Sequence, residues 1–470
     1  MARFDRNEFA DQFKKEQRYL IIQQNGRRVD QLYFYNGKGT YNYVCEQSFK
    51  GIIKRLIPRD EYKPKLVNDI YMDLMTEDPD DPHLVEVDSL NSNPKYINFQ
   101  NGLLDLETWK IVPFSPDIIY TRQIPCSYDP DEEPEYPEVL KDFLNHCFSG
   151  DSEQIDLLYE YMGLLISNID ASVTKNALFI TGQGNTGKSV LRNLLEDLVG
   201  SENCDASDIE EYNERFGTSQ LYLKRLGGCA DMKTGIVINP NVFKKITGSD
   251  KIRIEFKGEN AFSYKYTGML VFCANELPMI EADVGSHVFD RMCIMKATGV
   301  VYDENYPEFE GIVRRDPLLR QKLKDESVRK YLVHQAIKGL KRLMENNFTF
   351  HITQKNIDYM DEYKRRMLSV DYFIKDCCVT HEDYRDLDRF RTSDIYNAYE
   401  IWCASEKPRI TPHSKEQFFK SLTELGISGK NKIHGIDCFT SFTLNEAFRN
   451  KTHLSPATKP MDFTKGRLSL

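Results

Sequence analysis

The stretch Gly182-Gln-Gly-Asn-Thr-Gly-Lys-Ser189 decides the fold of this chain. It follows an apolar run, Asn176–Thr181, and precedes a helical pattern from Val190 to Val199. A glycine-rich loop between a strand and a helix N-terminus presents backbone N–H groups to phosphate oxygens. The sequence therefore predicts a loop that binds a nucleoside triphosphate, ATP, through Gly182, Gln183, Gly184, Asn185, Thr186, Gly187, Lys188 and Ser189.

Two side chains of the loop have predicted chemical roles. Lys188 would place a cation on the β- and γ-phosphates, and the Ser189 hydroxyl would ligate Mg²⁺. A second acid must hold the metal or polarise the attacking water. The apolar run that starts at Leu226 ends on Asp231, about forty residues after the loop, and this aspartate is the candidate. The predicted metal ligands are therefore Ser189 and Asp231.

Two further polar residues lie beside apolar runs. The run that starts at Met269 ends on Asn275, whose amide would hold the hydrolytic water and sense the γ-phosphate. Arg291 precedes another apolar run, where a guanidinium could project into a neighbouring subunit's site and stabilise the transition state in trans. With Lys188 and Asp231, these two residues complete the predicted catalytic set.

Apolar runs that recur through the middle of the chain predict a parallel α/β sheet. They are 176–181, 226–230, 269–274 and 292–296. We expect this domain organisation: an N-terminal α+β domain at 1–135, a helical collar for oligomerisation at 136–172, the nucleotide-binding core at 173–300, a helical extension at 301–370 and a basic, winged-helix-like domain at 371–470.

Length, charge and cysteine content limit the classes of protein. A chain of 470 residues is too long for one ordinary core, which indicates several domains. The net charge of −10 gives no overall positive field, so contact with nucleic acid requires local basic surfaces. The eleven cysteines form no Cys-x-x-Cys pair. Without a signal-like segment or a run of about eighteen apolar residues, we expect a soluble cytoplasmic protein with no membrane partner.

The order of these motifs resembles that of superfamily 3 helicases within the AAA+ class. The chain is most similar to the helicases of phages, phage satellites and mobile islands that are related to poxvirus-type primase-helicases. The motifs that carry the resemblance are Asn101-Gly-Leu-Leu-Asp-Leu-Glu107, the phosphate loop, Lys224-Arg-Leu226 ahead of Asp231, Ile246–Asp250, Ala274–Pro278 and Arg291. The resemblance implies an AAA+ P-loop core, the residue roles given above, a homo-hexameric ring and a bacterial host cell.

One departure concerns the second acidic motif. The resembling helicases usually end this motif on two polar residues, whereas this chain has Ala230-Asp231. One carboxylate would then serve both metal and water, and the identity of the general base stays open. Glu210 or Glu211 could contribute, although both are also typical of a solvated helix.

Two surfaces are candidates for DNA. The alternating stretch Lys251–Lys265 predicts a hairpin around Gly258, in which Phe256 is expected to pack. In the resembling helicases this hairpin enters the central channel, so a ring would place six copies of Lys257 around single-stranded DNA.

The second candidate surface is the tail 405–470, which has 11 Lys and Arg against 6 Asp and Glu. A helix capped by Thr392 or Ser393, a second helix capped by Ser414 and a glycine-rich hairpin at 426–443 follow the order of a winged helix. Such a domain could bind duplex origin DNA or dock a protein. The candidate contacts are Lys415, Gln417, Lys420, Lys430 and Lys432.

These features favour an ATP-dependent replicative DNA helicase that forms a ring around single-stranded DNA, with origin recognition by the C-terminal domain as a further role. Two alternatives stay open. One is an initiator or remodeller for which the nucleotide only switches assembly, as a single acid at Asp231 would allow. The other is an AAA+ ATPase that acts on protein. Primase activity is not supported, because 1–170 contains no cysteine-rich module and no convincing paired-acid strand.

Overall fold

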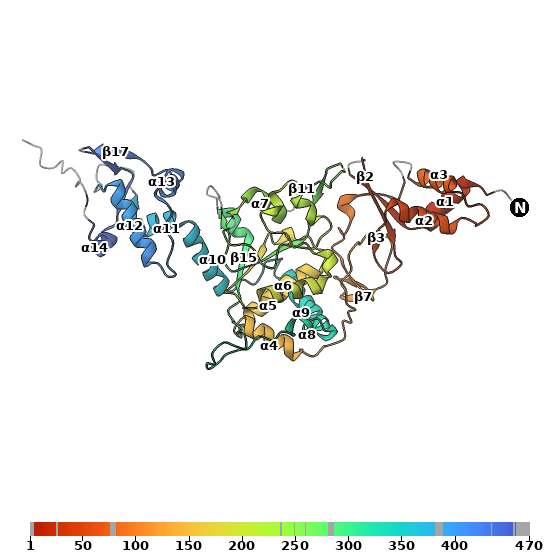
Figure 1. Cartoon of the computed structure of the whole chain (residues 1–470), viewed down its shortest axis with the longest axis horizontal. Helices are drawn as coiled ribbons and strands as arrows, with labels where there is room; N and C mark the ends of the chain where they lie inside the picture. Colours follow the sequence, from red (N-terminus) through yellow and green to blue (C-terminus); the bar gives the residue numbers. More distant parts are fainter. Residues whose placement is uncertain are drawn as a thin grey trace, which may run out of the picture. The chain divides into compact units, whose positions relative to one another are not determined.

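The computed structural model describes residues 4–24, 27–75, 81–235, 237–248, 250–258, 260–280, 286–380, 389–433, 435–454 and 456. The chain divides into two compact units, and Figure 1 labels many of their elements. Unit 1 comprises Met1–Pro278 and Asp290–Thr353, and unit 2 comprises Met279–Phe289 and Gln354–Leu470. Within the described part of the chain, no helix has the length and apolar character needed to cross a membrane.

Unit 1 begins with a small α+β arrangement. Its elements are α1 (Arg6–Glu16), β1 (Tyr19–Gln24), β2 (Arg27–Tyr35), β3 (Tyr41–Tyr43), α2 (Glu46–Leu56), α3 (Pro64–Leu74) and β4 (Leu84–Glu86). The strands form a sheet in the order β3-β2-β1-β4, in which β1 and β4 are parallel. The sequence predicts helices near Phe9–Tyr19 and Lys65–Met75. α1 and α3 confirm them with shifted ends, whereas α2 was not predicted.

A three-stranded antiparallel meander follows. It consists of β5 (Tyr96–Phe99), β6 (Gly102–Asp105) and β7 (Lys110–Val112), paired in that order. The sequence from Tyr96 to Phe114 predicts a hairpin with Asn101 and Gly102 as turn residues, and the antiparallel pairing of β5 with β6 confirms it. Short 3-10 turns connect elements along the chain: η1 (Val87–Ser89), η2 (Ala171–Val173), η3 (Ser201–Asn203), η4 (Glu211–Asn213), η5 (Gly217–Leu221) and η6 (Ser286–Arg291).

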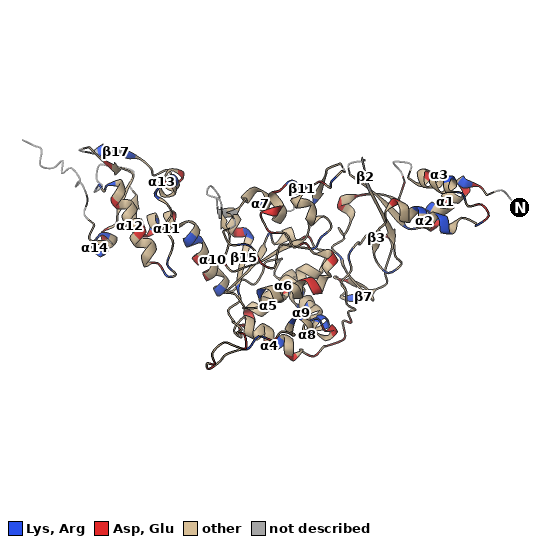
Figure 2. Ribbon diagram, in the orientation of Figure 1, with Lys and Arg blue, Asp and Glu red and all other residues tan. Residues whose placement is uncertain are grey.

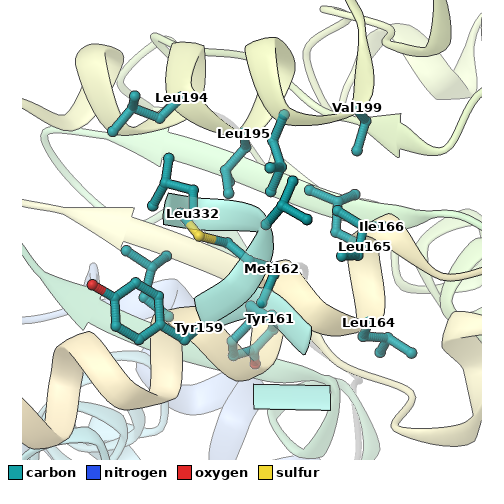
Figure 3. Packing of buried hydrophobic residues seen from close by; sticks show 14 of the residues in the cluster. Tyr159, Tyr161, Met162, Leu164, Leu165, Ile166, Leu194, Leu195, Val199 and Leu332 are labelled. Atoms are coloured by element: carbon teal, nitrogen blue, oxygen red, sulfur yellow. The ribbon is translucent and has the colours of Figure 1, made fainter. Parts of the chain in front are cut away.

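Two helices then lead into the centre of unit 1, as predicted for 136–172. They are α4 (Glu138–Cys147) and α5 (Ser152–Ile166), and α5 packs along α9 (Glu326–Glu345). The contact is close because Gly163 faces the Ala336 carbonyl oxygen and Gly339 faces the Tyr159 carbonyl oxygen, where a Cβ on either glycine would collide. Figure 3 shows the apolar layer in which α5 side chains meet Leu194, Leu195 and Val199.

The predicted parallel sheet is confirmed. Its strands are β8 (Ala177–Thr181), β9 (Leu226–Gly227), β13 (Met269–Ala274) and β15 (Met292–Lys296), in the order β15-β8-β13-β9, and all three pairings are parallel. The last two strands have the predicted bounds. β9 is shorter than the predicted 226–230, but the segment continues along β13 through hydrogen bonds from Cys273 N to Cys229 O and from Met232 N to Cys273 O.

Several elements surround this sheet in unit 1. They are α6 (Lys188–Val199), β10 (Val237–Ile238), α7 (Pro240–Thr247), β11 (Lys251–Ile254), β12 (Phe262–Lys265) and α8 (Leu319–Lys322). β11 and β12 pair in antiparallel register, with Lys251 opposite Lys265, which confirms the predicted hairpin around Gly258. Exposed and buried residues alternate along both strands, so one face of the hairpin is exposed and the other face is buried.

Unit 2 is mainly helical with two small antiparallel pairs. Its elements are β14 (Met279–Ile280), α10 (Gln354–Met367), α11 (Ser369–Cys377), β16 (Cys378–Thr380), α12 (Thr392–Ser405), α13 (Lys415–Glu424), β17 (Lys430–Ile433), β18 (Ile436–Phe439), β19 (Phe442–Leu444) and α14 (Glu446–Thr452). β16 pairs with β19, and β17 pairs with β18. The core includes Phe373, Tyr399, Trp402 and Phe418.

Two helix N-caps in unit 2 were predicted from the sequence, and the structure tests both. Ser414 caps α13 in a capping box with Gln417, as predicted. The cap predicted at Thr392 or Ser393 is wrong, because Arg391 occupies the N-cap of α12 without a side-chain cap bond. Thr392 is already the first helical residue, and its backbone cannot take the extended conformation that a cap residue needs.

Candidate nucleotide-binding site

The phosphate loop connects the end of β8 to the start of α6. Gly187 is the N-cap of α6, with φ of 88° and no side-chain cap bond, so the first N–H groups of the helix remain available to a ligand. Lys188 Nζ donates hydrogen bonds to the carbonyls of Gly182, at 2.8 Å, and Gln183, at 2.7 Å. Burial lowers the pKa of Lys188, and the nearby negative charge of Asp231 opposes this shift.

Three predicted parts of the site, the phosphate loop, Asn275 and Asp231, lie at the carboxyl edge of the sheet. Thr181 at the end of β8 aligns with Ala274 at the end of β13, and Ala274 also pairs with Met232. The phosphate loop, Asn275 and Asp231 therefore leave the sheet at the same edge. The side chains of Asn275 and Asp231 are both exposed there.

A hydrogen bond joins the loop directly to the acidic segment. Ser189 Oγ donates to the Ala230 carbonyl at 3.2 Å, which places the hydroxyl beside Asp231. No group of three or more His, Cys, Asp or Glu residues among those described is arranged to hold a metal ion. A hydroxyl, one carboxylate and substrate phosphates are, however, the usual ligands of Mg²⁺, so Ser189 and Asp231 fit the predicted metal.

A buried arginine that the sequence analysis missed fixes the acidic segment. Arg192 of α6 is fully buried and donates to the carbonyls of Gly228, at 2.7 Å, and Asp205, at 2.9 Å. Its guanidinium also pairs with Glu196 at 2.8 Å. Gly228 has φ of 92°, and a Cβ there would meet the Val271 carbonyl oxygen. The helix that starts at the phosphate loop is thus tied to the strand that delivers Asp231.

A second missed residue, Asp208, is a carboxylate close to this segment. It is buried, and its oxygens accept hydrogen bonds from Cys229 Sγ and Lys233 N, both at 3.4 Å. These two partners flank Asp231 on either side in the sequence. Glu210 and Glu211, the acids weighed as general bases, are exposed in and beside η4. The structure therefore places Asp208 against the Asp231 segment.

Arg225, within the Lys224-Arg-Leu226 motif, anchors the start of β9. It is buried, and its guanidinium donates to the carbonyls of Leu164, Leu165 and Thr267. Burial, followed by the charge of Arg122, lowers the pKa of Arg225 to about 9. Two of these carbonyls belong to the last turn of α5, so Arg225 satisfies acceptors that the helix itself leaves open.

Arg291 lies at the other edge of the sheet. It precedes β15, whose first residue Met292 aligns with Ala177 at the start of β8. Five residues of strand, about 16 Å at 3.3 Å per residue, separate that position from the phosphate loop. Arg291 Nη1 donates to Thr247 Oγ1 at 3.0 Å and to the Lys244 carbonyl at 3.3 Å, at the end of α7. One chain therefore does not bring Arg291 to its own Lys188.

A pocket of about 800 Å³ opens beside the loop. α4, the loop, the first turn of α6, Val301 and residues between 313 and 322 line it. Its apolar lining includes Val139, Phe143, Val190, Val301, Val313 and Leu319, and its basic lining includes Lys188, Arg314, Arg315, Arg320 and Lys322. This volume lies in the usual range of small-molecule sites and suits a nucleoside triphosphate. The sequence analysis did not predict that residues of 313–322 would border this pocket.

The hairpin β11–β12 presents one exposed lysine near its turn. Lys257 is exposed, and within the described residues it has no ion pair. Phe256 packs against Tyr222, with ring centroids 5.8 Å apart, as predicted. Glu255 accepts a hydrogen bond from Arg215, which lowers the pKa of Glu255. Phe256 therefore packs within unit 1, whereas the side chain of Lys257 is exposed to solvent.

The basic residues predicted to contact DNA in unit 2 have different surroundings. Figure 2 marks the lysine and arginine positions of the ribbon in blue. Lys415 and Lys432 are exposed, and Lys420 pairs with Glu424 at 3.6 Å. Lys430 Nζ lies 4.0 Å from the centroid of the Phe419 ring, in a cation–π contact. Gln417 is occupied by the capping box of α13. Lys415 and Lys432 are therefore the lysines of this set that are most open to a ligand.

Comparisons with known proteins match two parts of the chain. Residues 18–149 match the family described as "D5 N terminal like", and residues 180–291 match a family of unknown function, DUF5906. Two curated relatives are putative helicase 121R of Invertebrate iridescent virus 3 and putative helicase 184R of Invertebrate iridescent virus 6. The first is 26% identical over 344 residues, 67% of this chain and 35% of that protein. The second is 29% identical over 157 residues, 29% of this chain and 15% of that protein.

Two solved structures of the apo NrS-1 C-terminal region also align with 93% of the chain and with the whole of those chains. Their TM-scores are 0.47 and 0.45, and both are 13% identical in sequence. The chain spans only about a third of the first curated relative. The D5-type match and the iridovirus relatives confirm the relationship that the motif order predicts, to replication proteins of the phage and viral primase-helicase type.

Proposed function

We propose that this chain is the subunit of an ATP-dependent DNA helicase that assembles as a homo-hexameric ring around single-stranded DNA. One observation carries this proposal: the phosphate loop and Arg291 lie at opposite edges of the same sheet. If Arg291 acts on the γ-phosphate, it must come from another subunit. A head-to-tail contact between identical subunits closes into a ring when its rotation permits.

The sheet supports an AAA+ assignment for the core. β13 lies between the strand that precedes the phosphate loop and the strand that precedes Asp231. This inserted strand delivers Asn275 between the loop and the acid, where an amide can contact both the γ-phosphate and a water molecule.

The residues at the carboxyl edge then have distinct tasks. The loop N–H groups and Lys188 hold the β- and γ-phosphates, and Asn275 orients the attacking water. Ser189 and Asp231 would hold Mg²⁺, which neutralises developing charge on the phosphates. Asp208 is our candidate for the second acid, which the Ala230-Asp231 motif lacks. Arg291 of a neighbouring subunit stabilises the charge of the transition state.

Two surfaces would contact DNA. Lys257, exposed at the hairpin turn, would contact phosphates of the strand inside the ring. Unit 2 has the order of a winged helix, with α13 and the β17–β18 hairpin presenting Lys415 and Lys432. We assign this unit to duplex DNA, such as a replication origin, because exposed lysines on a recognition helix and a wing suit phosphate contacts.

The test is steady-state ATP hydrolysis by the wild type and Lys188→Ala, with and without single-stranded DNA, together with strand displacement from a forked duplex. We expect hydrolysis that requires Lys188, increases with single-stranded DNA and accompanies displacement. Absence of Lys188-dependent hydrolysis would overturn the proposal.

A second function, an ATP-switched initiator or remodeller, is favoured by the single acid of the Ala230-Asp231 motif. Hydrolysis without displacement in the same experiment would select it. Hydrolysis that single-stranded DNA neither binds nor stimulates would instead select an ATPase that acts on protein.

A further inference from the structure

An ordered loop at 302–315 projects from unit 1 after β15, beside α4 (Figure 1). Its ends are joined by hydrogen bonds from Tyr302 N to Val313 O and from Arg315 N to Tyr302 O, both at 2.9 Å. Arg314 lies inside the loop and donates to the carbonyls of Asp303, at 2.8 Å, and Tyr306, at 2.9 Å. The loop is thus held in one conformation, which lowers the entropy lost when it binds a partner.

The loop exposes aromatic surface. Tyr302 contacts Tyr306 and Phe309, with ring centroids 4.6 Å and 5.1 Å apart. Tyr306 is 51% exposed and Phe309 44% exposed, and Leu318 just beyond the loop is 55% exposed. A contiguous cluster of exposed large apolar side chains, unlike a single one, indicates a site of interaction.

The loop is also acidic. Residues 303–310 contain four carboxylates and no basic residue. Two of them are paired at the base of the loop, Asp303 with Arg315 and Glu308 with Arg314. Glu304 and Glu310 are exposed, and no ion pair involves them within the residues that the structure describes. A partner surface for this loop must therefore combine apolar contact with positive charge.

The position of the loop identifies that partner. Val313, Arg314 and Arg315, at the end of the loop, line the pocket at the phosphate loop, so a surface that delivers an arginine to this side of the pocket would lie beside the loop. Arg291 is bonded to the last turn of α7, which carries Lys244 and Lys245. In the described part of the chain neither lysine has an ion pair, and both would travel with Arg291.

We propose that the 302–315 loop docks on the α7 face of a second copy of this chain, the face that carries Arg291. The aromatic cluster supplies the apolar contact, and Glu304 and Glu310 meet Lys244 and Lys245. The loop thereby aligns the neighbour's arginine with the pocket that it borders. This inference rests on the proposed function, because it takes the shared site as the reason for the contact.

The first test measures how assembly and ATP hydrolysis depend on protein concentration for the full chain. Tyr306→Ser with Phe309→Ser is expected to raise the concentration of half-maximal specific activity about tenfold or more, because truncated interface aromatics are costly. Light scattering with a non-hydrolysable ATP analogue should show the same shift in assembly. Tyr43→Ser, at a tyrosine that is 60% exposed elsewhere in unit 1, is the matched control and should shift neither.

The second test reverses the charges and does not depend on the aromatic variants folding well. Glu304→Lys with Glu310→Lys should weaken assembly, and so should Lys244→Glu with Lys245→Glu. All four changes in one chain should restore it. Unchanged assembly in the single-face variants, or no restoration in the combined variant, would overturn the inference. Loss of Lys188-dependent hydrolysis in the wild type would instead overturn the proposed function, so the two failures are distinguishable.

Discussion

The two edges of the parallel sheet differ in what they carry and in how they are held. At the carboxyl edge the phosphate loop, Asp231 and Asn275 converge from three strands, and Ser189 is hydrogen-bonded beside the acid. At the amino edge Arg291 is bonded to the end of α7, a strand's length away. One chain therefore does not bring Arg291 to its own phosphate loop, and the role that we propose for Arg291 would make hydrolysis depend on assembly.

The largest effect is expected from a substitution that changes only the carboxyl edge of the sheet. Asp231→Asn removes the carboxylate that would hold the metal, and we expect DNA-stimulated hydrolysis to fall about 10²–10³-fold. Nucleotide binding measured without Mg²⁺ should be retained. Glu210→Gln is the matched control, because this acid is exposed and is not assigned to the metal. If Glu210→Gln lost hydrolysis to this extent while Asp231→Asn stayed active, the essential carboxylate would be Glu210 and not Asp231.

A second change tests how that edge is held. Gly228→Ala should destabilise the protein by about 2–4 kcal/mol, because a side chain there adds backbone strain and collides with the Val271 carbonyl. Gly235→Ala is the control, since Gly235 also has positive φ, 78°, but has no atom within 4 Å of the added Cβ. It should cost about 1–2 kcal/mol, from strain alone. Urea unfolding measures both, and equal losses would contradict the close contact.

A third change affects neither edge. Lys257→Ala should keep hydrolysis without DNA close to the wild-type rate and lose most of the stimulation by single-stranded DNA, because the lysine would contact the strand and not the nucleotide. Lys110→Ala, at an exposed lysine on β7, is the control. Normal stimulation and unwinding by Lys257→Ala would remove the hairpin from the mechanism.

The smallest expected effect lies in unit 2. Lys432→Ala should weaken duplex DNA binding modestly and reduce the slope of log affinity against log salt by about one per bound subunit. Lys375→Ala, at a lysine paired with Asp371, should leave the slope unchanged. A change in sequence preference without a change in slope would indicate a base contact and not a phosphate contact.

The parts of the molecule that the sequence predicted are those whose cause is local. The phosphate loop is encoded by eight adjacent residues, and β13 and β15 are short apolar runs whose bounds matched the structure. The start of α2 was missed because its N-cap, Cys45, makes no side-chain cap bond. The start of α12 was misplaced for a similar reason, since Arg391 gives no capping signal.

The parts of the site that were missed depend on tertiary contacts. Arg192 has the pattern of an ordinary helical residue, and its role follows from carbonyls at Asp205 and Gly228 that only the fold brings near. Asp208 is likewise defined by contacts with residues more than twenty positions away. The pocket border at 313–322 contains no sequence motif that predicts its position. Spacing along the chain carries no information about such contacts.

The most direct test of the shared site mixes two inactive variants. Lys188→Ala has an intact arginine, and Arg291→Ala has an intact phosphate loop, so neighbouring subunits of different type can form a complete site. Each variant alone should show almost no hydrolysis, and an equal mixture should recover about a quarter of the wild-type activity if subunits assemble at random in a ring. A mixture no more active than the sum of the separate variants would contradict a site shared between subunits.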